Sequence, residues 1–228
     1  PPETHLETAR YWRIPIHQRL LLGASRDRAE GGSEIAVATS TRYARHKESL
    51  TWFGPWTAAS QVLFSGTVEL RGGKAWSYRI GAGYERSEMP ETGEAGARPG
   101  LGSEVLHAGL GRKLGDGGKL RLSVSRRSRF PSMREMFSTA LGKFHPNNDL
   151  GQETQNLLEA EYSLRRSRGE ASMGVFSSFL EGGIEKVPYE GPATYQRVNR
   201  DEIRVHGLEL MLGWRPRPGL HLGFQHSQ

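Results

Sequence analysis

Apolar and polar residues alternate along most of the chain with a period of two. From Val62 to Leu70 every second residue is apolar or glycine, and the residues between them are polar except for Leu63. This period is typical of a β-strand with one apolar and one polar face, and no stretch shows a convincing helical period. Clear alternation also covers 35–43, 76–85, 106–114, 120–124, 158–164, 208–214 and 220–224, and weaker alternation covers 20–24 and 171–179. The chain is therefore predicted to be all-β, with about ten strands.

Short and long connections alternate between these segments. Tight turns are predicted where glycine and other turn residues cluster, at Gly72-Gly73, 115–118, 166–169 and 215–219. Long loops are expected at about 46–60, 87–103, 129–152 and 181–194. In an antiparallel up-and-down meander all the short turns then lie at one end and all the long loops at the other. With strands of about ten residues, this arrangement is typical of an outer-membrane β-barrel.

A soluble antiparallel sandwich or barrel would alternate in the same way, with its apolar face turned inward. Glycine on the polar face argues against it, because glycine only weakens a sheet that faces water but makes room for side chains in a crowded barrel lumen. The glycines concerned are Gly81, Gly83, Gly109, Gly111, Gly207, Gly213 and Gly223.

Aromatic residues on the apolar face also favour a membrane barrel, because they gather near the predicted strand ends. Trp76 and Trp214 fall at the short-turn end, and Tyr43, Phe64 and Tyr84 fall at the long-loop end. Two such rows are typical of the aromatic girdles at the two membrane interfaces. We therefore expect the apolar face to contact outer-membrane lipid.

Composition removes several function classes. The 228 residues carry 31 Lys and Arg against 25 Asp and Glu, a net charge of +6, and contain no cysteine. Disulfides, thiolate metal sites and cysteine nucleophiles are thus excluded. The longest apolar run, Leu20 to Ala24, is far too short for a membrane-spanning helix. The arginines are scattered and no nucleic-acid module is readable, so no nucleic-acid partner is expected.

Enzymatic motifs are missing as well. Gly81-Ala82-Gly83 and Gly109-Leu110-Gly111 lack the third glycine and the helix of a dinucleotide site. No phosphate-binding loop, zinc-protease helix or nucleophile elbow is present, and the eight histidines are dispersed. We expect no catalytic residue, no metal site and no cofactor, and the chain is not expected to be an enzyme.

The loop from Arg129 to Gln152 is too long to be a mere hairpin connection, so function or its own packing must hold it. Pro131 is expected to end the preceding strand, and Arg129 can pair with Glu135 or Glu153 across the base of the loop. A structural role is favoured for these residues over direct contact with a ligand.

Three groups of motif residues lie in this loop and in the hairpin that follows it. They are Arg129, Pro131, Ser132, Glu135 and Phe137, then Asn148, Asp149, Leu150, Glu153, Thr154 and Glu159, then Phe179, Ile184, Tyr195, Asn199, Gly207 and Glu209. In these residues the sequence resembles the TonB-dependent outer-membrane receptors. The likeness is strongest over 125–214, and two residues depart from the family pattern, Gln152 at a usual proline and Glu161 at a usual glycine.

The resemblance implies a 22-stranded transmembrane barrel with an N-terminal plug domain in its lumen. Ten strands cannot form that barrel, so residues 1–228 are expected to be an internal part of it, without the plug and the remaining strands. Implied partners are outer-membrane lipid, the receptor's own plug, the inner-membrane TonB energy complex engaged through the plug, and a small-molecule ligand. Arg129, Pro131, Glu135, Leu150 and Glu153 form the loop-base motif.

The implied function is energy-coupled uptake of a scarce ligand, most often an iron–siderophore complex. Haem, cobalamin, other metal chelates and oligosaccharides are alternative cargoes. Candidate ligand-contact residues on the long loops are Trp52, Trp56, Phe144 and His145. The alternative functions, in decreasing order of support from the sequence, are a passive porin, an outer-membrane enzyme and a soluble carbohydrate-binding sheet.

Overall fold

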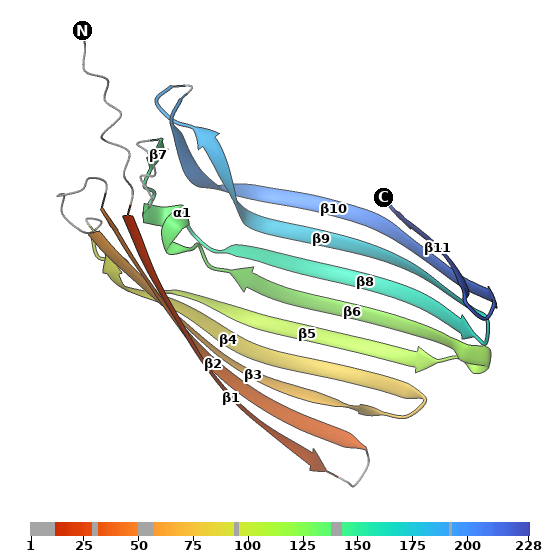
Figure 1. Cartoon of the computed structure of the whole chain (residues 1–228). Coiled ribbons are helices and arrows are strands. Elements are labelled where there is room, and N and C mark those ends of the chain that lie inside the picture. Colours follow the sequence, from red (N-terminus) through yellow and green to blue (C-terminus); the bar gives the residue numbers. More distant parts are fainter. Residues whose placement is uncertain (1–11, 29–31, 50–56, 94–95, 138–142, 192) are drawn as a thin grey trace.

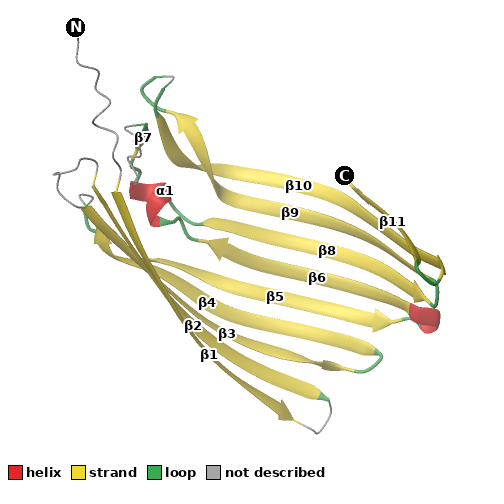
Figure 2. Ribbon diagram, viewed as in Figure 1, coloured by secondary structure: helices red, strands yellow, loops and turns green. Residues whose placement is uncertain are grey.

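The computed structural model describes residues 12–28, 32–49, 57–93, 96–137, 143–191 and 193–228. These residues form one curved antiparallel sheet (Figure 1) with two short helices (Figure 2). Its strands are β1 Trp12–Arg28, β2 Ser33–Ser49, β3 Thr57–Gly73, β4 Trp76–Thr92, β5 Leu101–Lys113, β6 Gly118–Arg129, β7 Phe144–His145, β8 Glu153–Arg166, β9 Gly169–Pro188, β10 Tyr195–Arg217 and β11 Leu220–Ser227. The helices are the 3-10 turn Gly115–Gly117 and α1 Met133–Phe137.

The strand order confirms the predicted meander. Ten strands follow one another in sequence order from β1 to β11, and β7 lies off this path, paired in parallel with β10. The predicted turns join β3 to β4, β5 to β6, β8 to β9 and β10 to β11 at one end of the sheet, and the longer connections and α1 lie at the other end (Figure 1). In the described residues, no helix is long and apolar enough to cross a membrane.

The strands are longer than predicted, and three of the long loops are correspondingly shorter. The strands from β2 to β10, β7 apart, run from 12 residues in β6 to 23 in β10, whereas alternation marks about ten in each. The connection expected at 181–194 shrinks to 189–194, because β9 and β10 continue to pair up to Pro188 and Tyr195. In this hairpin the apolar residues Ile184, Val187 and Val198 stand singly among polar ones, so hydrophobic alternation gives no signal there although backbone pairing continues.

The alternating apolar residues share one face, as predicted, and they remain exposed. Strand register places Leu110 opposite Leu122, Leu122 opposite Ala160, and Ala160 opposite Val175. Leu158 is 57% exposed, and apart from Pro131 only four apolar side chains among those described are buried: Ala59, Val105, Met136 and Leu150. A sheet with so small a core does not have the closed interior of a soluble sandwich.

Glycines on the polar face make room for neighbouring side chains. Glu69, Gly81 and His107 are opposite one another on β3, β4 and β5. A Cβ on Gly81 would lie 2.1 Å from the His107 ring, which reaches across it to place Nε2 3.0 Å from Glu69. A Cβ on Gly83, Gly111, Gly207 or Gly213 would also lie too close to neighbouring atoms, whereas a Cβ on Gly109 or Gly223 would make only ordinary van der Waals contact.

The predicted position of one of the two aromatic rows, the row at the long-loop end, is wrong. Trp76 begins β4, and Trp214 is three residues from the end of β10, near the short turns as expected. Tyr43, Phe64 and Tyr84, however, lie well inside their strands, because these strands continue beyond them. From Trp76 to Tyr84 the strand rises about 26 Å at roughly 3.3 Å per residue, close to the height of an apolar membrane band. The residues beyond Tyr84 therefore form a polar extension of the sheet.

Candidate functional site

Arg129 joins the two ends of the long loop. Its Nη1 donates to both oxygens of Glu135, at 3.0 and 2.8 Å, and its Nε donates to Glu153 Oε2. Register pairs Arg129 directly with Glu153, where β6 ends and β8 begins. The Arg129 side chain is 48% exposed, whereas those of Glu135 and Glu153 are 21% and 15% exposed. The arginine thus contacts both carboxylates that the sequence offers as partners.

Helix α1 begins with a capping box that the strand-based prediction missed. The Ser132 amide and hydroxyl donate to Glu135 Oε2 at 2.8 and 2.9 Å, and the Glu135 amide donates to Ser132 Oγ at 3.3 Å. Serine three residues before glutamate is the sequence signal for such a helix start. Burial of the Glu135 carboxyl raises its pKa, but hydrogen bonds from Arg129 and Ser132 outweigh this and leave the pKa lowered.

The loop is also anchored by buried groups. Strand β6 ends two residues before Pro131, close to the predicted end, and the Pro131 carbonyl accepts a hydrogen bond from Gln61 Nε2 at 3.0 Å. Gln61 lies on β3 and is buried, so it joins the loop to a distant strand. Met136 and Leu150 are fully buried. Leu150, placed in the loop-base motif by resemblance alone, is thus enclosed by neighbouring residues.

Asn199 on β10, a motif residue for which the sequence predicts no role, forms a second junction. Its Oδ1 accepts from the Gly151 amide at 2.7 Å, and its Nδ2 donates to the carbonyls of Gly151 and Gly182 at 3.2 and 2.6 Å. Glu153 Oε1 accepts from the Ile184 amide at 2.6 Å. The return of the loop to β8 is therefore fixed to both β9 and β10.

The structure separates Phe144 and His145. Because β7 pairs Phe144 with Tyr195 and His145 with Gln196, the two side chains lie on opposite sides of the sheet. The Phe144 ring lies 6.0 Å from that of Tyr195, and the His145 ring lies 4.5 Å from that of Tyr189. Trp52 and Trp56 lie outside the described residues.

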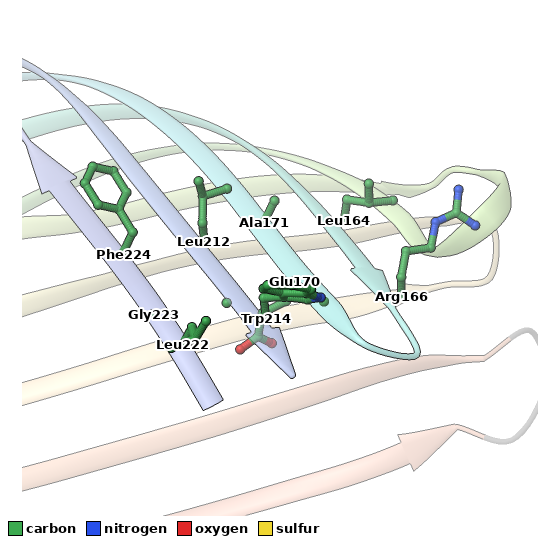
Figure 3. Close-up of a pocket in the computed structure, with 11 residues that line it drawn as sticks. Leu164, Arg166, Glu170, Ala171, Leu212, Trp214, Leu222, Gly223 and Phe224 are labelled. Atoms are coloured by element: carbon green, nitrogen blue, oxygen red, sulfur yellow. The ribbon is translucent and has the colours of Figure 1, made fainter. Parts of the chain in front are cut away.

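A groove near the short turns of β8 to β11 has a different character (Figure 3). Its apolar lining consists of Leu164, Ala171, Leu212, Trp214, Leu222 and Phe224. These side chains belong to the exposed apolar face and the edge strand β11, so the groove is not a candidate ligand site. Among the described residues, no group of three or more His, Asp or Glu is placed to hold a metal ion.

Comparison with known families assigns this architecture. The model of the family described as "TonB dependent receptor-like, beta-barrel" matches residues 19–227. The chain belongs to this family. TonB-dependent receptor barrels are outer-membrane proteins of Gram-negative bacteria, which agrees with the predicted localisation. No curated protein matches the sequence.

Solved structures share the fold of this TonB-dependent receptor barrel. The copper transporter OprC superposes with a TM-score of 0.71 at 15% identity, over 95% of this chain and 38% of that one. The apo form of the FrpB iron transporter from Neisseria meningitidis gives 0.70 at 15% identity, over 94% and 36%. The siderophore receptor PirA from Pseudomonas aeruginosa gives 0.65 at 15% identity, over 98% and 42%. The chain thus spans about two fifths of the length of these structures.

Proposed function

We propose that the chain is part of an outer-membrane receptor that imports a scarce metal chelate, namely an iron–siderophore complex. The proton gradient across the inner membrane would supply the energy for this import. The observation that carries this proposal is the family match over almost the whole chain. The three structural neighbours are described as a copper transporter, an iron transporter and a siderophore receptor, so metals and their chelates are their common cargo. No covalent chemistry is proposed for these residues.

The proposal includes strands and a plug that this chain does not supply. In the described residues β1 and β11 each pair on one side only, and an open sheet of this kind leaves two edges and an apolar face uncovered. Further strands would close the sheet into a barrel of 22, lipid would cover the apolar face, and a plug would fill the lumen. The plug would also carry the contact with the TonB energy complex.

The loop base is proposed to be structural. Arg129 neutralises two partly buried carboxylates, and Pro131 and Leu150 are buried, so all five motif residues contribute to holding the loop. A passive porin is the alternative function, since its strands would alternate in the same way. The paired loop motifs at 129–159 favour the receptor.

Uptake by cells that produce the full-length protein separates these two functions. Uptake of a radiolabelled ferric siderophore should stop when a protonophore collapses the proton gradient, and the purified protein should not conduct in a planar bilayer. Unchanged uptake in de-energised cells, together with steady conductance, would establish the porin instead. A sucrose-uptake control, carried out in a strain with a known porin, confirms that the protonophore leaves passive entry intact.

A further inference from the structure

The apolar groove near the short turns opens on the membrane face of the sheet, away from the path of an imported ligand (Figure 3). Its floor consists of Gly169 and Ala171, two small residues of β9. Directly opposed residues of neighbouring strands point to the same side of a sheet, so larger residues on both sides form the walls. These are Leu164 and Arg166 on β8, and Leu212 and Trp214 on β10. The two walls belong to strands about 10 Å apart, which leaves room for a hydrocarbon chain between them.

The groove lies in a part of the sheet that is paired on both sides. Register joins 169–171 of β9 to β8 and to β10 without a break. Further strands that pair with β11 in the proposed barrel would therefore leave the floor and the walls in place. Leu212 and Trp214 are 52% and 55% exposed, so the described part of the chain leaves the groove open.

At the turns, the groove adjoins a hollow rich in arginine. The turns of the β8–β9 and β10–β11 hairpins meet there, because the Arg215 amide donates to the Arg168 carbonyl oxygen at 2.7 Å. The arginine hollow is lined by Arg165, Arg166, Arg168 and Arg215, and it shares Arg166 and Gly169 with the groove. The carboxylate in its lining, Glu170, is bonded to Arg165 at 3.2 Å. Neither Arg168 nor Arg215 takes part in an ion pair with another described residue. The surplus of positive charge favours an anion in this hollow.

The level of the groove in the membrane follows from its neighbours. Trp214 belongs to the aromatic row at the short-turn end, and such rows lie at the membrane–water interface. The short turns of outer-membrane barrels lie on the periplasmic side. Basic pockets at this depth are suited to the phosphate groups of lipids. The groove then extends from the level of the headgroups into the apolar part of the membrane.

We propose that the arginine hollow and the groove together bind an anionic phospholipid of the periplasmic leaflet. The phosphate would lie between Arg166 and Arg168, and one acyl chain would lie along Gly169 and Ala171. Guanidinium groups make strong charge-assisted hydrogen bonds to phosphate oxygens. A free phosphate or an acidic protein would use the hollow and leave the groove empty, whereas a phospholipid fills both. The inference goes beyond the proposed function, because it does not depend on the imported ligand.

Lipid titration of the purified full-length receptor in neutral detergent tests the site. Native mass spectrometry measures the affinities of phosphatidylglycerol and of phosphatidylcholine with the same acyl chains. The receptor should bind phosphatidylglycerol about 25-fold more tightly, at roughly fivefold for each of two arginines. R166Q/R168Q should remove this preference, and R166K/R168K should retain most of it. K113Q/K119Q is the matched control, because it removes two cations that are paired across β5 and β6 on the polar face at the same end of the sheet.

A variant that fills the groove tests the acyl-chain site without changing any charge. A171L should weaken the binding of both lipids about tenfold, the effect of uncovering roughly two CH₂ groups, and should keep the preference for phosphatidylglycerol. A160L adds the same volume to the apolar face outside the groove and should leave both affinities unchanged. Heat-modifiable mobility on gels checks that each variant is folded.

Three results would overturn the site. Equal loss of phosphatidylglycerol in K113Q/K119Q would show that only the overall charge matters. Unchanged affinities in A171L would show that no acyl chain occupies the groove. Displacement of phosphatidylglycerol by an equal concentration of glycerol 3-phosphate would assign the hollow to a free anion. Uptake of a ferric siderophore by cells is a separate measurement, so loss of lipid selectivity with normal energy-dependent uptake would refute this site and leave the proposed function standing.

Discussion

At the residue scale, Arg129 joins the two ends of the long loop through Glu135 and Glu153. One guanidinium serves two carboxylates that are each less than a quarter exposed, at the point where strand pairing between β6 and β8 ends. Its removal would leave both carboxylates without their charged partner. A paired charge of this kind contributes more than an exposed surface ion pair, because the uncompensated partner stays partly buried.

Arg129→Ala should therefore lower the amount of folded receptor in the outer membrane before it alters ligand affinity. The expected loss is about 1–3 kcal/mol in the free energy of unfolding. Quantitative immunoblotting of heat-modifiable receptor measures folded abundance, and ligand titration measures affinity. Arg121→Ala, on the same strand and in none of the ion pairs among the described residues, is the control. Normal abundance with lost binding would instead assign Arg129 to direct ligand contact.

Glu135 should make the loop sensitive to acid. Its pKa is lowered in the folded protein, so the carboxylate stabilises α1 above the pKa of the unfolded chain and loses this effect as pH falls through the folded-state pKa. Hydrogen exchange of the 132–137 amides should quicken, after correction for intrinsic rates, between about pH 6 and about pH 3. Glu135→Gln should weaken protection at the upper pH and remove this dependence, and an unchanged pH profile in the variant would contradict the account.

Close packing across the polar face decides stability at the scale of the strands. Gly83 and Gly109 both lie on this face, on neighbouring strands β4 and β5. A Cβ on Gly83 would lie 2.5 Å from the Gly66 carbonyl oxygen, whereas a Cβ on Gly109 would lie 3.7 Å from the Leu122 carbonyl oxygen. The first contact requires movement of backbone and the second is ordinary van der Waals contact.

Gly83→Ala should destabilise the folded receptor by about 1–3 kcal/mol. Gly109→Ala should be neutral or stabilise it by about 0.5 kcal/mol, since alanine restricts the unfolded strand. Urea unfolding in lipid vesicles measures both variants against the parent. Equal destabilisation of both variants would show that glycine is needed here for a reason other than space.

Across the whole molecule, the sequence predicted the elements governed by alternation and missed those governed by local hydrogen bonds. The strands and the exposed apolar face follow from the period of two, and the turn positions follow from clustered glycine and other turn residues. Helix α1 was missed because five residues are too few to show a helical period, although Ser132 and Glu135 carry its start signal. Asn199 and Gln61 contact segments 48 and 70 residues away in sequence, and no local pattern reveals such pairs.

The central claim, that one face of this sheet meets lipid and the other does not, can be tested along a single strand. The chain has no cysteine, so single cysteines at positions 120–125 of the full-length receptor can each carry a fluorophore. In vesicles with brominated lipid, labels that replace Leu120, Leu122 and Val124 should be quenched, and labels that replace Arg121, Ser123 and Ser125 should not. Quenching that does not alternate along the strand, or that favours the odd positions, would contradict the account.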